Sequence, residues 1–215
     1  MKKNTRKLKK AALLLCSAVL LVCISIGATV AYLTSTQTVT NTFTVGNVAI
    51  TMDEAKVGAD GKALTGEAAE RVQANTYKLF PGGEYDKDPT IHVGATSENA
   101  YLGVKVVFEG SKNADANLKL NMLSIFTGVD ENAWDIEKRH DSNNDVYYLL
   151  TYKNVISKGN NIQLFNKVMI PDEMTNEQIA DLNNIKMVIT AYAVQKDGFD
   201  TPSEALTTAF ATEFA

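Results

Sequence analysis

Apolar side chains recur at every second position in several parts of this 215-residue chain, and this period of two constrains the fold more than any other feature. Between residues 101 and 109 one alternating set is apolar, whereas Lys105 and Glu109 belong to the other set. The apolar set is Leu102, Val104, Val106 and Phe108. Because successive side chains of a strand point to opposite faces of a sheet, this segment is predicted to be a half-buried antiparallel strand.

Similar signals predict further strands and a few short helices. Strands are expected at residues 48–52, 90–93, 134–137, 146–152, 162–170 and 185–194, and the last is apolar on both faces, which indicates a central core strand. Residues 53–75 are expected to be an irregular insert with a short helix at 67–73. Thr175 and Thr201 each open a capping-box pattern that predicts a helix. Together these elements predict a mainly β fold, an antiparallel β-sandwich with short helices.

The first 31 residues have the pattern of an export signal. Residues 1–10 carry six basic side chains, and residues 11–30 carry no charge and are rich in Leu, Val, Ile and Ala. A basic start, an apolar stretch and small residues at its end are typical of a secretory signal peptide. We expect cleavage between Ala31 and Tyr32, with cleavage after Gly27 as the alternative. An uncleaved membrane anchor is a third interpretation of the same stretch.

From residue 32 onward the chain is acidic and contains no cysteine. Of the 21 Lys and Arg residues, six lie in the leader, which leaves 15 basic against 25 acidic residues and a net charge of −10. Nucleic-acid binding depends on basic surfaces, so we expect no nucleic-acid partner. Both cysteines, Cys16 and Cys23, belong to the leader, so the processed protein has no disulfide, no thiolate metal site and no cysteine nucleophile.

A threonine-rich segment follows the leader. Threonine occupies every even position from 34 to 44, and the odd positions are Ser, Gln, Val, Asn and Phe. This period predicts a strand with one polar and one weakly apolar face, and such a strand is weakly specified in register. It fits either the first strand of the sandwich or a strand donated to a neighbouring molecule. The candidate donor residues are Thr34, Thr36, Thr38, Val39, Thr40, Thr42, Phe43, Thr44 and Val45.

Side chains suited to catalysis or metal binding are sparse. The two histidines, His92 and His140, are 48 residues apart and do not form the helical pair that zinc proteases use. Asp86, Asp88 and His92 are near enough in sequence for a small ligand cluster, although solvated loop acids are the favoured interpretation. The oxygen-rich run 141–145 resembles a calcium loop but lacks its Gly and distal Glu, so a hairpin tip is favoured. We therefore expect no catalytic residue, no cofactor and no metal.

Four aromatic residues are candidates for a carbohydrate-binding face. They are Trp134, Tyr147, Tyr148 and Tyr152. Aromatic residues on predicted strands more often pack in the core or pair across strands, and that is the favoured interpretation.

Three groups of segments carry a family resemblance. They read ATVAYLT at residues 28–34 with NTFTVGNVAI at 41–50, then LFPG, KDPTI and AYLGVKV between residues 79 and 106, and finally ITAYAVQ at 189–195. Together they resemble the TasA/camelysin family of exported surface and biofilm-matrix proteins. The first group is similar to a signal junction that a dedicated signal peptidase, SipW, cuts.

The resemblance implies a jelly-roll-like sandwich and self-association into extracellular fibres. In such fibres the freed N-terminal segment of one subunit completes the sheet of the next, and the 14 residues from Tyr32 to Val45 can reach about 46 Å when extended. The implied protein is a secreted, non-catalytic structural subunit of the matrix or cell surface of a Gram-positive-type bacterium. Its partners would be its own copies, the signal peptidase during export, and a second matrix or anchor protein as a further candidate.

The expected organisation is a signal peptide at 1–31, an N-terminal strand segment at 32–52 and a β-sandwich domain at 53–215. Two other functions remain open at this point. One is a camelysin-like metallo-endopeptidase, and the other is a monomeric surface adhesin or carbohydrate-binding module.

Overall fold

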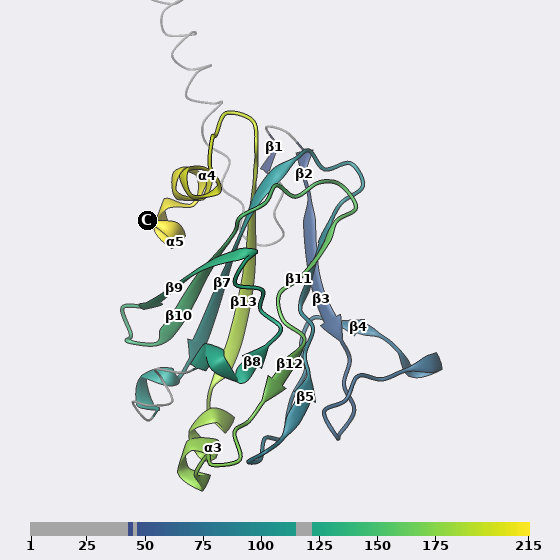
Figure 1. Ribbon diagram of the computed structural model, residues 1–215, viewed down its shortest axis with the longest axis vertical. Coiled ribbons are helices and arrows are strands. Elements are labelled where there is room, and N and C mark those ends of the chain that lie inside the picture. Colours follow the sequence, from purple (N-terminus) through teal and green to yellow (C-terminus); the bar gives the residue numbers. More distant parts are fainter. Residues whose placement is uncertain (1–42, 45–46, 115–121) are drawn as a thin grey trace, which may run out of the picture. The chain divides into compact units, whose positions relative to one another are not determined.

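Two four-stranded antiparallel sheets, named here the main sheet and the second sheet, lie on either side of the core in the computed structural model (Figure 1). The structure describes residues 43–44, 47–114 and 122–215, which all belong to one compact unit. The strand order of the main sheet is β13 (Lys186–Gln195), β7 (Ala100–Glu109), β10 (Val146–Tyr152) and β9 (Trp134–His140). The order of the second sheet is β11 (Asn161–Gln163), β6 (Thr90–Val93), β3 (Ile50–Ala55) and β4 (Arg71–Val72).

Shorter strands complete the fold. A three-stranded sheet has the order β5 (Glu84–Asp86), β12 (Lys167–Met169) and β8 (Phe126–Thr127), and a small hairpin joins β1 (Phe43–Thr44) to β2 (Asn47–Val48). Every strand pairing is antiparallel. The 3₁₀ turns are η1 (Gly66–Ala68), η2 (Ser111–Asn113) and η3 (Met122–Ile125). The predicted mainly β sandwich with short helices is therefore confirmed.

The core lies between the two sheets. Leu102, Val104 and Val106 of β7 are completely buried, and Ile91 of β6 meets them from the second sheet with no exposed surface. The alternation that the sequence predicted for residues 101–109 thus corresponds to β7, and it places one face of that strand in the core.

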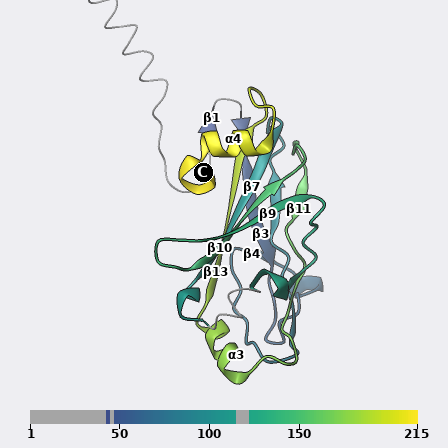
Figure 2. The same cartoon turned by 60° about the vertical axis from the view of Figure 1, so that its left-hand side comes forward.

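The C-terminal helices cover the outer face of the main sheet (Figure 2). Helix α4 (Pro202–Ala209) starts where the Thr201 hydroxyl accepts a hydrogen bond from the Glu204 N–H, with Pro202 at the first helical position. Leu206 of α4 and Phe214 of α5 (Ala211–Phe214) pack together on the apolar outer side of the sheet. Helix α3 (Asn176–Asn183) begins with the complete capping box predicted at Thr175.

Three predicted elements differ from the structure. Residues 162–170 form two strands, β11 and β12, because the intervening Leu164 and Phe165 turn into the core instead of continuing a ladder. Within residues 67–73 the structure has the end of η1 and the strand β4 in place of a helix, because this segment pairs with β3. The boundary at residue 53 falls inside β3, so the sandwich already includes residues 47–52, with Val48 and Ile50 buried.

The prediction of a central strand at residues 185–194 is wrong, because β13 lies at the edge of the main sheet. Its sequence is apolar on both faces for another reason. Ala191 and Ala193 face the core, whereas Tyr192 and Val194 face α4 and α5 on the outer side. Two covered faces give the same sequence pattern as a central strand, although β7 is the only one of the described strands that is hydrogen-bonded to β13.

Candidate functional site

The edge strand β13 is a candidate site for strand pairing, because β7 is the only one of the described strands that is hydrogen-bonded to it. The Lys196 N–H donates to the Asn99 carbonyl across 2.8 Å, and the antiparallel register alternates from there. The backbone groups of even-numbered residues therefore point toward β7. Those of Ile189 and Ala193 point away from β7. The outward-pointing N–H and C=O groups of an edge strand are groups with which a further strand can pair.

The two edges of the main sheet differ in charge. Five of the seven residues of β9 are ionisable, which is a common protection against pairing between molecules. In contrast, β13 carries no charged residue between Met187 and Val194. An added strand would therefore meet charges at the β9 edge and an uncharged backbone at the β13 edge.

A small cleft lies beside β13, at the open side of the sandwich. Met187 and Ile189 of β13 form one wall and Met52 of β3 contributes to the other. These three residues pack against the core but are only partly buried. The cleft holds about 110 Å³, which is small for a metabolite and comparable with a few side chains. Its remaining lining residues are Asp53, Glu54, Gln73, Ala74, Asn75, Lys87 and Pro89.

The polar wall of the cleft is built around a buried ion pair. Lys87 Nζ lies 2.5 Å from Glu54 Oε2, and the two side chains are only 11% and 7% exposed. Asn75 Nδ2 donates to Glu54 Oε1 across 3.0 Å and to the Ala55 carbonyl across 2.8 Å. The burial and the neighbouring Glu54 carboxylate raise the pKa of the Tyr77 phenol, which therefore stays protonated. These groups satisfy each other and hold the wall in place.

Residues 71–75, named here the strap, lie along the edge of β3. The strand β4 within the strap pairs with Glu54 and Ala55, and the pairing stops there. One step further, Gln73 Nε2 donates to the Met52 carbonyl across 3.0 Å. The Gly94 N–H donates to the Ala49 carbonyl, so the backbone groups of Ala49 point toward Gly94, the residue directly after β6. Because this direction alternates along an antiparallel strand, the Met52 carbonyl, three residues further on, points away from β6. The Gln73 amide thus takes the place of a strand at this edge.

Arg71 fastens the strap to the second sheet. Its Nε lies 2.7 Å from Asp53 Oδ1, and its Nη1 lies 2.5 Å from Asp88 Oδ2. His92 joins the same cluster, with Nε2 2.9 Å from Asp53 Oδ1 and Nδ1 2.7 Å from Asn161 Oδ1. The hydrogen bonds to Asp53 and Asn161 raise the pKa of His92. Partial burial acts against ionisation of Asp53, but hydrogen bonds from His92 and Arg71 outweigh it and lower the pKa of that carboxyl.

Asp86, Asp88 and His92, which were considered from the sequence as a small ligand cluster, do not converge on one point in the structure. Asp86 Oδ2 accepts from the Ala63 N–H, whereas Asp88 binds Arg71 and His92 binds Asp53. Within the described part of the chain, no group of three or more His, Cys, Asp or Glu residues is arranged to hold a metal ion.

The oxygen-rich run at 141–145 is the turn between β9 and β10. Asp141 Oδ1 accepts from the N–H groups of Asn143 and Asp145, and Asn144 has the positive φ of 67° that such a tip requires. Asp145 is buried and accepts from the Lys112 N–H. The Asp141 carboxylate therefore serves the turn itself, whereas the Asp145 carboxylate joins the turn to η2.

The four aromatic residues considered for carbohydrate binding lie on both faces of the main sheet. Trp134 is buried against Tyr152 at a ring distance of 4.9 Å, and Tyr148 is buried against Phe108. Tyr147 lies on the outer face, where the Lys105 ammonium is 4.8 Å from its ring. They do not form one exposed platform.

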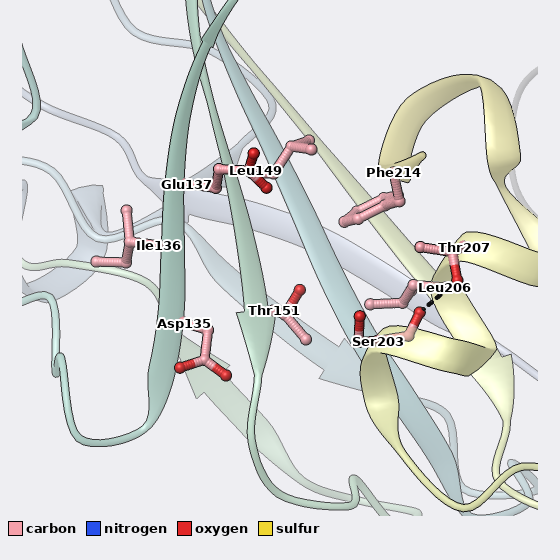
Figure 3. Close-up of a pocket in the computed structure, with 9 residues that line it drawn as sticks. All are labelled: Asp135, Ile136, Glu137, Leu149, Thr151, Ser203, Leu206, Thr207 and Phe214. Atoms are coloured by element: carbon pink, nitrogen blue, oxygen red, sulfur yellow. Dashed lines mark hydrogen bonds between the residues drawn. The ribbon is translucent and has the colours of Figure 1, made fainter.

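A second hollow lies on the outer face of the main sheet, between β9 and the C-terminal helices (Figure 3). Leu149, Leu206 and Phe214 form its apolar floor. Asp135 and Glu137 lie on its rim, where Asp135 is 3.3 Å from Lys153 and Glu137 is 2.8 Å from Arg139. Both acids are thus neutralised by partners within the chain, and the hollow holds about 190 Å³.

The structure covers only part of the sequence-predicted site. Phe43 and Thr44 form β1 and pair with Val48 and Asn47 of the same chain. The cleavage residues Ala31 and Tyr32 lie outside the described residues, as do the other candidate donor residues, Thr34, Thr36, Thr38, Val39, Thr40, Thr42 and Val45. The strap and the edge position of β13 were not identified from the sequence, because strand order and contacts between distant segments leave no local signal.

Comparison with known proteins gives no match: no family model fits the chain, and no curated protein or solved structure is significantly similar to it. Among the described residues, no helix is both long and apolar enough to cross a bilayer.

Proposed function

We propose that this protein is a secreted, non-catalytic structural subunit that assembles into fibres at a cell surface or in a biofilm matrix. The observation that carries the proposal is the uncharged edge strand β13, which borders a partly buried apolar cleft. In the proposed assembly, the threonine-rich segment of one copy pairs with this edge on the next copy. Main-chain hydrogen bonds supply affinity, and alternate side chains supply register.

The chemistry of the segment matches that of the edge. Residues 32–45 carry no charge, and neither do residues 187–194 of β13. The rest of the processed chain is acidic, so an uncharged contact between copies avoids part of their mutual repulsion. Val39 and the other odd-numbered residues form the weakly apolar face of the segment, which suits the cleft, and the threonine face then points outward.

The position at which the threonine-rich segment joins the sandwich also supports the proposal. The last residues of the threonine-rich segment, Phe43 and Thr44, form β1, which pairs with β2, and β2 packs beside β13. The described end of the segment therefore belongs to a hairpin that lies near an edge of the kind that the segment is proposed to complete. Before cleavage the apolar leader would keep the segment at the membrane, so assembly would be confined to the outside of the cell.

The test compares two purified chains. One begins at Tyr32, and the other begins at Phe43 and so retains every element that the structure describes. Sedimentation over a concentration series and electron microscopy should show long polymers for the first chain only. Equal polymerisation by both chains would remove the threonine-rich segment from the assembly, and monomers of both would favour a surface adhesin.

A further inference from the structure

We propose that Lys87 and Asn75 become joined by a covalent amide bond, formed within the folded chain with Glu54 as the proton carrier. This self-modification goes beyond the proposed fibre role, because it depends only on contacts inside one subunit.

Three side chains of the types that such a bond requires meet in the wall of the cleft. Lys87 Nζ lies 2.5 Å from Glu54 Oε2, and Asn75 Nδ2 donates to Glu54 Oε1 across 3.0 Å. One carboxylate therefore bridges an amine and a carboxamide. Glu54 belongs to β3, Asn75 ends the strap and Lys87 follows β5, so the fold brings the three residues together.

Burial distinguishes this set from an ordinary surface ion pair. The side chains of Lys87 and Glu54 are 11% and 7% exposed, whereas those of the pair Lys56 and Glu70 are 48% and 56% exposed. The Tyr77 ring adds an aromatic wall, with its centroid 5.4 Å from Lys87 Nζ. A site with little water holds the reacting groups in one arrangement and limits competing hydrolysis of the amide.

The Asn75 amide is oriented for attack at its carbon atom. Its Nδ2 donates to Glu54 and also to the Ala55 carbonyl at 2.8 Å, and its Oδ1 accepts from the Val57 N–H at 3.0 Å. When an amine adds to Cγ, negative charge develops on Oδ1, where the Val57 N–H stabilises it. The nitrogen that must leave, Nδ2, is the atom that faces the carboxylate.

The reaction balances without an oxidant, a reductant or an added reactant. Glu54 accepts one proton from the Lys87 ammonium, and the neutral Nζ forms a bond to Asn75 Cγ. Glu54 then gives this proton to Nδ2, the Cγ–Nδ2 bond breaks, and ammonia leaves into the cleft. Glu54 removes the second proton from Nζ and passes it to the ammonia. One ammonium group and one carboxamide thus become one secondary amide and one ammonium ion.

The bond would fasten the end of the strap to the segment between β5 and β6. The chain has no cysteine after residue 23, so a disulfide is not available for this purpose. An amide between positions 75 and 87 closes a loop that unfolding cannot open, as a disulfide does in other proteins. The structure describes the side chains before this reaction, when the ion pair of Lys87 and Glu54 still holds the wall.

The experiment follows the mass of the chain that begins at Tyr32, which retains every element that the structure describes. During incubation of the folded protein at neutral pH, a product lighter by one ammonia should accumulate. Cyclisation of an asparagine onto its own backbone causes the same mass loss, so the denatured product is digested with trypsin. Unreacted chain gives the linear peptides 72–78 and 79–87. Reacted Lys87 is not cut, so the product gives peptide 72–78 attached to peptide 79–105, with the branch between positions 75 and 87.

Two variants test the assigned roles. Glu54→Gln preserves the size of the side chain but carries no proton, and it should slow the reaction at least about a hundredfold. Lys87→Arg is the matched control, because it keeps a cation beside Glu54 but should retain the unreacted mass and both linear peptides. Circular dichroism verifies that each variant is folded.

Two results on the wild-type chain would overturn the proposal. One is folded protein that keeps its full mass, and the other is a loss of ammonia that yields linear peptides only. A branched product that forms as fast in Glu54→Gln as in the wild type would refute the role of Glu54. None of these results bears on strand donation, which the comparison of the chains beginning at Tyr32 and Phe43 tests separately.

Discussion

Gly103 lies at the centre of β7, under the C-terminal helices, and its replacement by alanine gives a stability prediction with a calculable origin. A methyl group there would lie 2.5 Å from Phe214 Cζ, 2.8 Å from Phe214 Cε1 and 2.9 Å from Leu206 Cδ1. Carbon atoms in contact lie about 3.5–4.0 Å apart, so α5 must move outward by roughly 1 Å. Gly103→Ala therefore tests whether the helices are seated on the sheet as the structure describes.

Two effects of Gly103→Ala oppose each other. Overpacking of a filled site costs about 1–3 kcal/mol. Replacing glycine by alanine within a strand raises the free energy of unfolding by about 0.5–1 kcal/mol, because the unfolded chain loses conformational freedom. The net expectation is a loss of about 1–2 kcal/mol in the free energy of unfolding, or roughly 2–8 °C in melting temperature for a domain of this size.

Urea denaturation of the processed chain measures the effect, and Phe214→Ala supplies the control background. Phe214 is 6% exposed, so the single variant loses stability through its lost burial. Once the ring is absent, most of the clash is absent too, and adding Gly103→Ala should cost little or stabilise the protein. The reasoning is refuted if Gly103→Ala costs the same in both backgrounds, or if it costs nothing when Phe214 is present.

Three further results are expected. Lys87→Met should lower the free energy of unfolding by about 3 kcal/mol in urea titrations, because it leaves the Glu54 carboxylate buried without its cation. Adding Glu54→Gln to the same chain should restore much of the lost stability. A larger loss in the double variant would contradict this explanation. Thr175→Ala should cost about 1 kcal/mol by removing the hydroxyl that caps α3, whereas Thr175→Ser should be near neutral. The interaction of Asp53 with His92 should stabilise the fold most between about pH 4 and 6.5. The melting temperatures of the wild-type protein and the His92→Gln variant should therefore differ most in that window. A constant difference from about pH 4 to 9 would contradict a stabilising interaction between the two side chains.

The sign of the pH effect follows from the two shifts. The pKa of His92 is raised in the folded protein, so its contribution is complete below the ordinary histidine value and fades as pH rises through the folded value. The pKa of Asp53 is lowered, so its contribution is complete above the ordinary aspartate value and fades as pH falls through the folded value.

Local patterns were sufficient to predict most of the elements that the structure describes. The alternation at residues 101–109 identified β7, and the capping box at Thr175 identified α3, because both signals depend on neighbouring residues only. The break between β11 and β12 escaped prediction because Leu164 and Phe165 are as apolar as a strand interior. Their burial depends on the distant segments that pack on them.

The order of the strands could not be predicted in the same way. The residues of β13 are apolar on both faces because the core covers one side and Tyr192 meets Phe210 and Phe214 on the other. Nothing in that segment specifies that, of the strands that the structure describes, only β7 is hydrogen-bonded to it.

The contacts of the strap join residues that are far apart in sequence. Arg71 binds Asp53, 18 residues away, and Gln73 binds the Met52 carbonyl, 21 residues away. Such pairs have no characteristic spacing. The sequence therefore identified a candidate donor segment, whereas the edge position of β13 became visible only in the fold.

Hydrogen exchange of the backbone amides of β13 tests the central claim most directly. In the unassembled chain beginning at Tyr32, the amides of Ile189 and Ala193 point away from β7 and should exchange more rapidly than those of Thr190 and Tyr192. In fibres that are exchanged and then dissolved for nuclear magnetic resonance, all four should be protected. Fibres in which the amides of Ile189 and Ala193 exchange as rapidly as before assembly would show that the edge of β13 does not receive the donated strand.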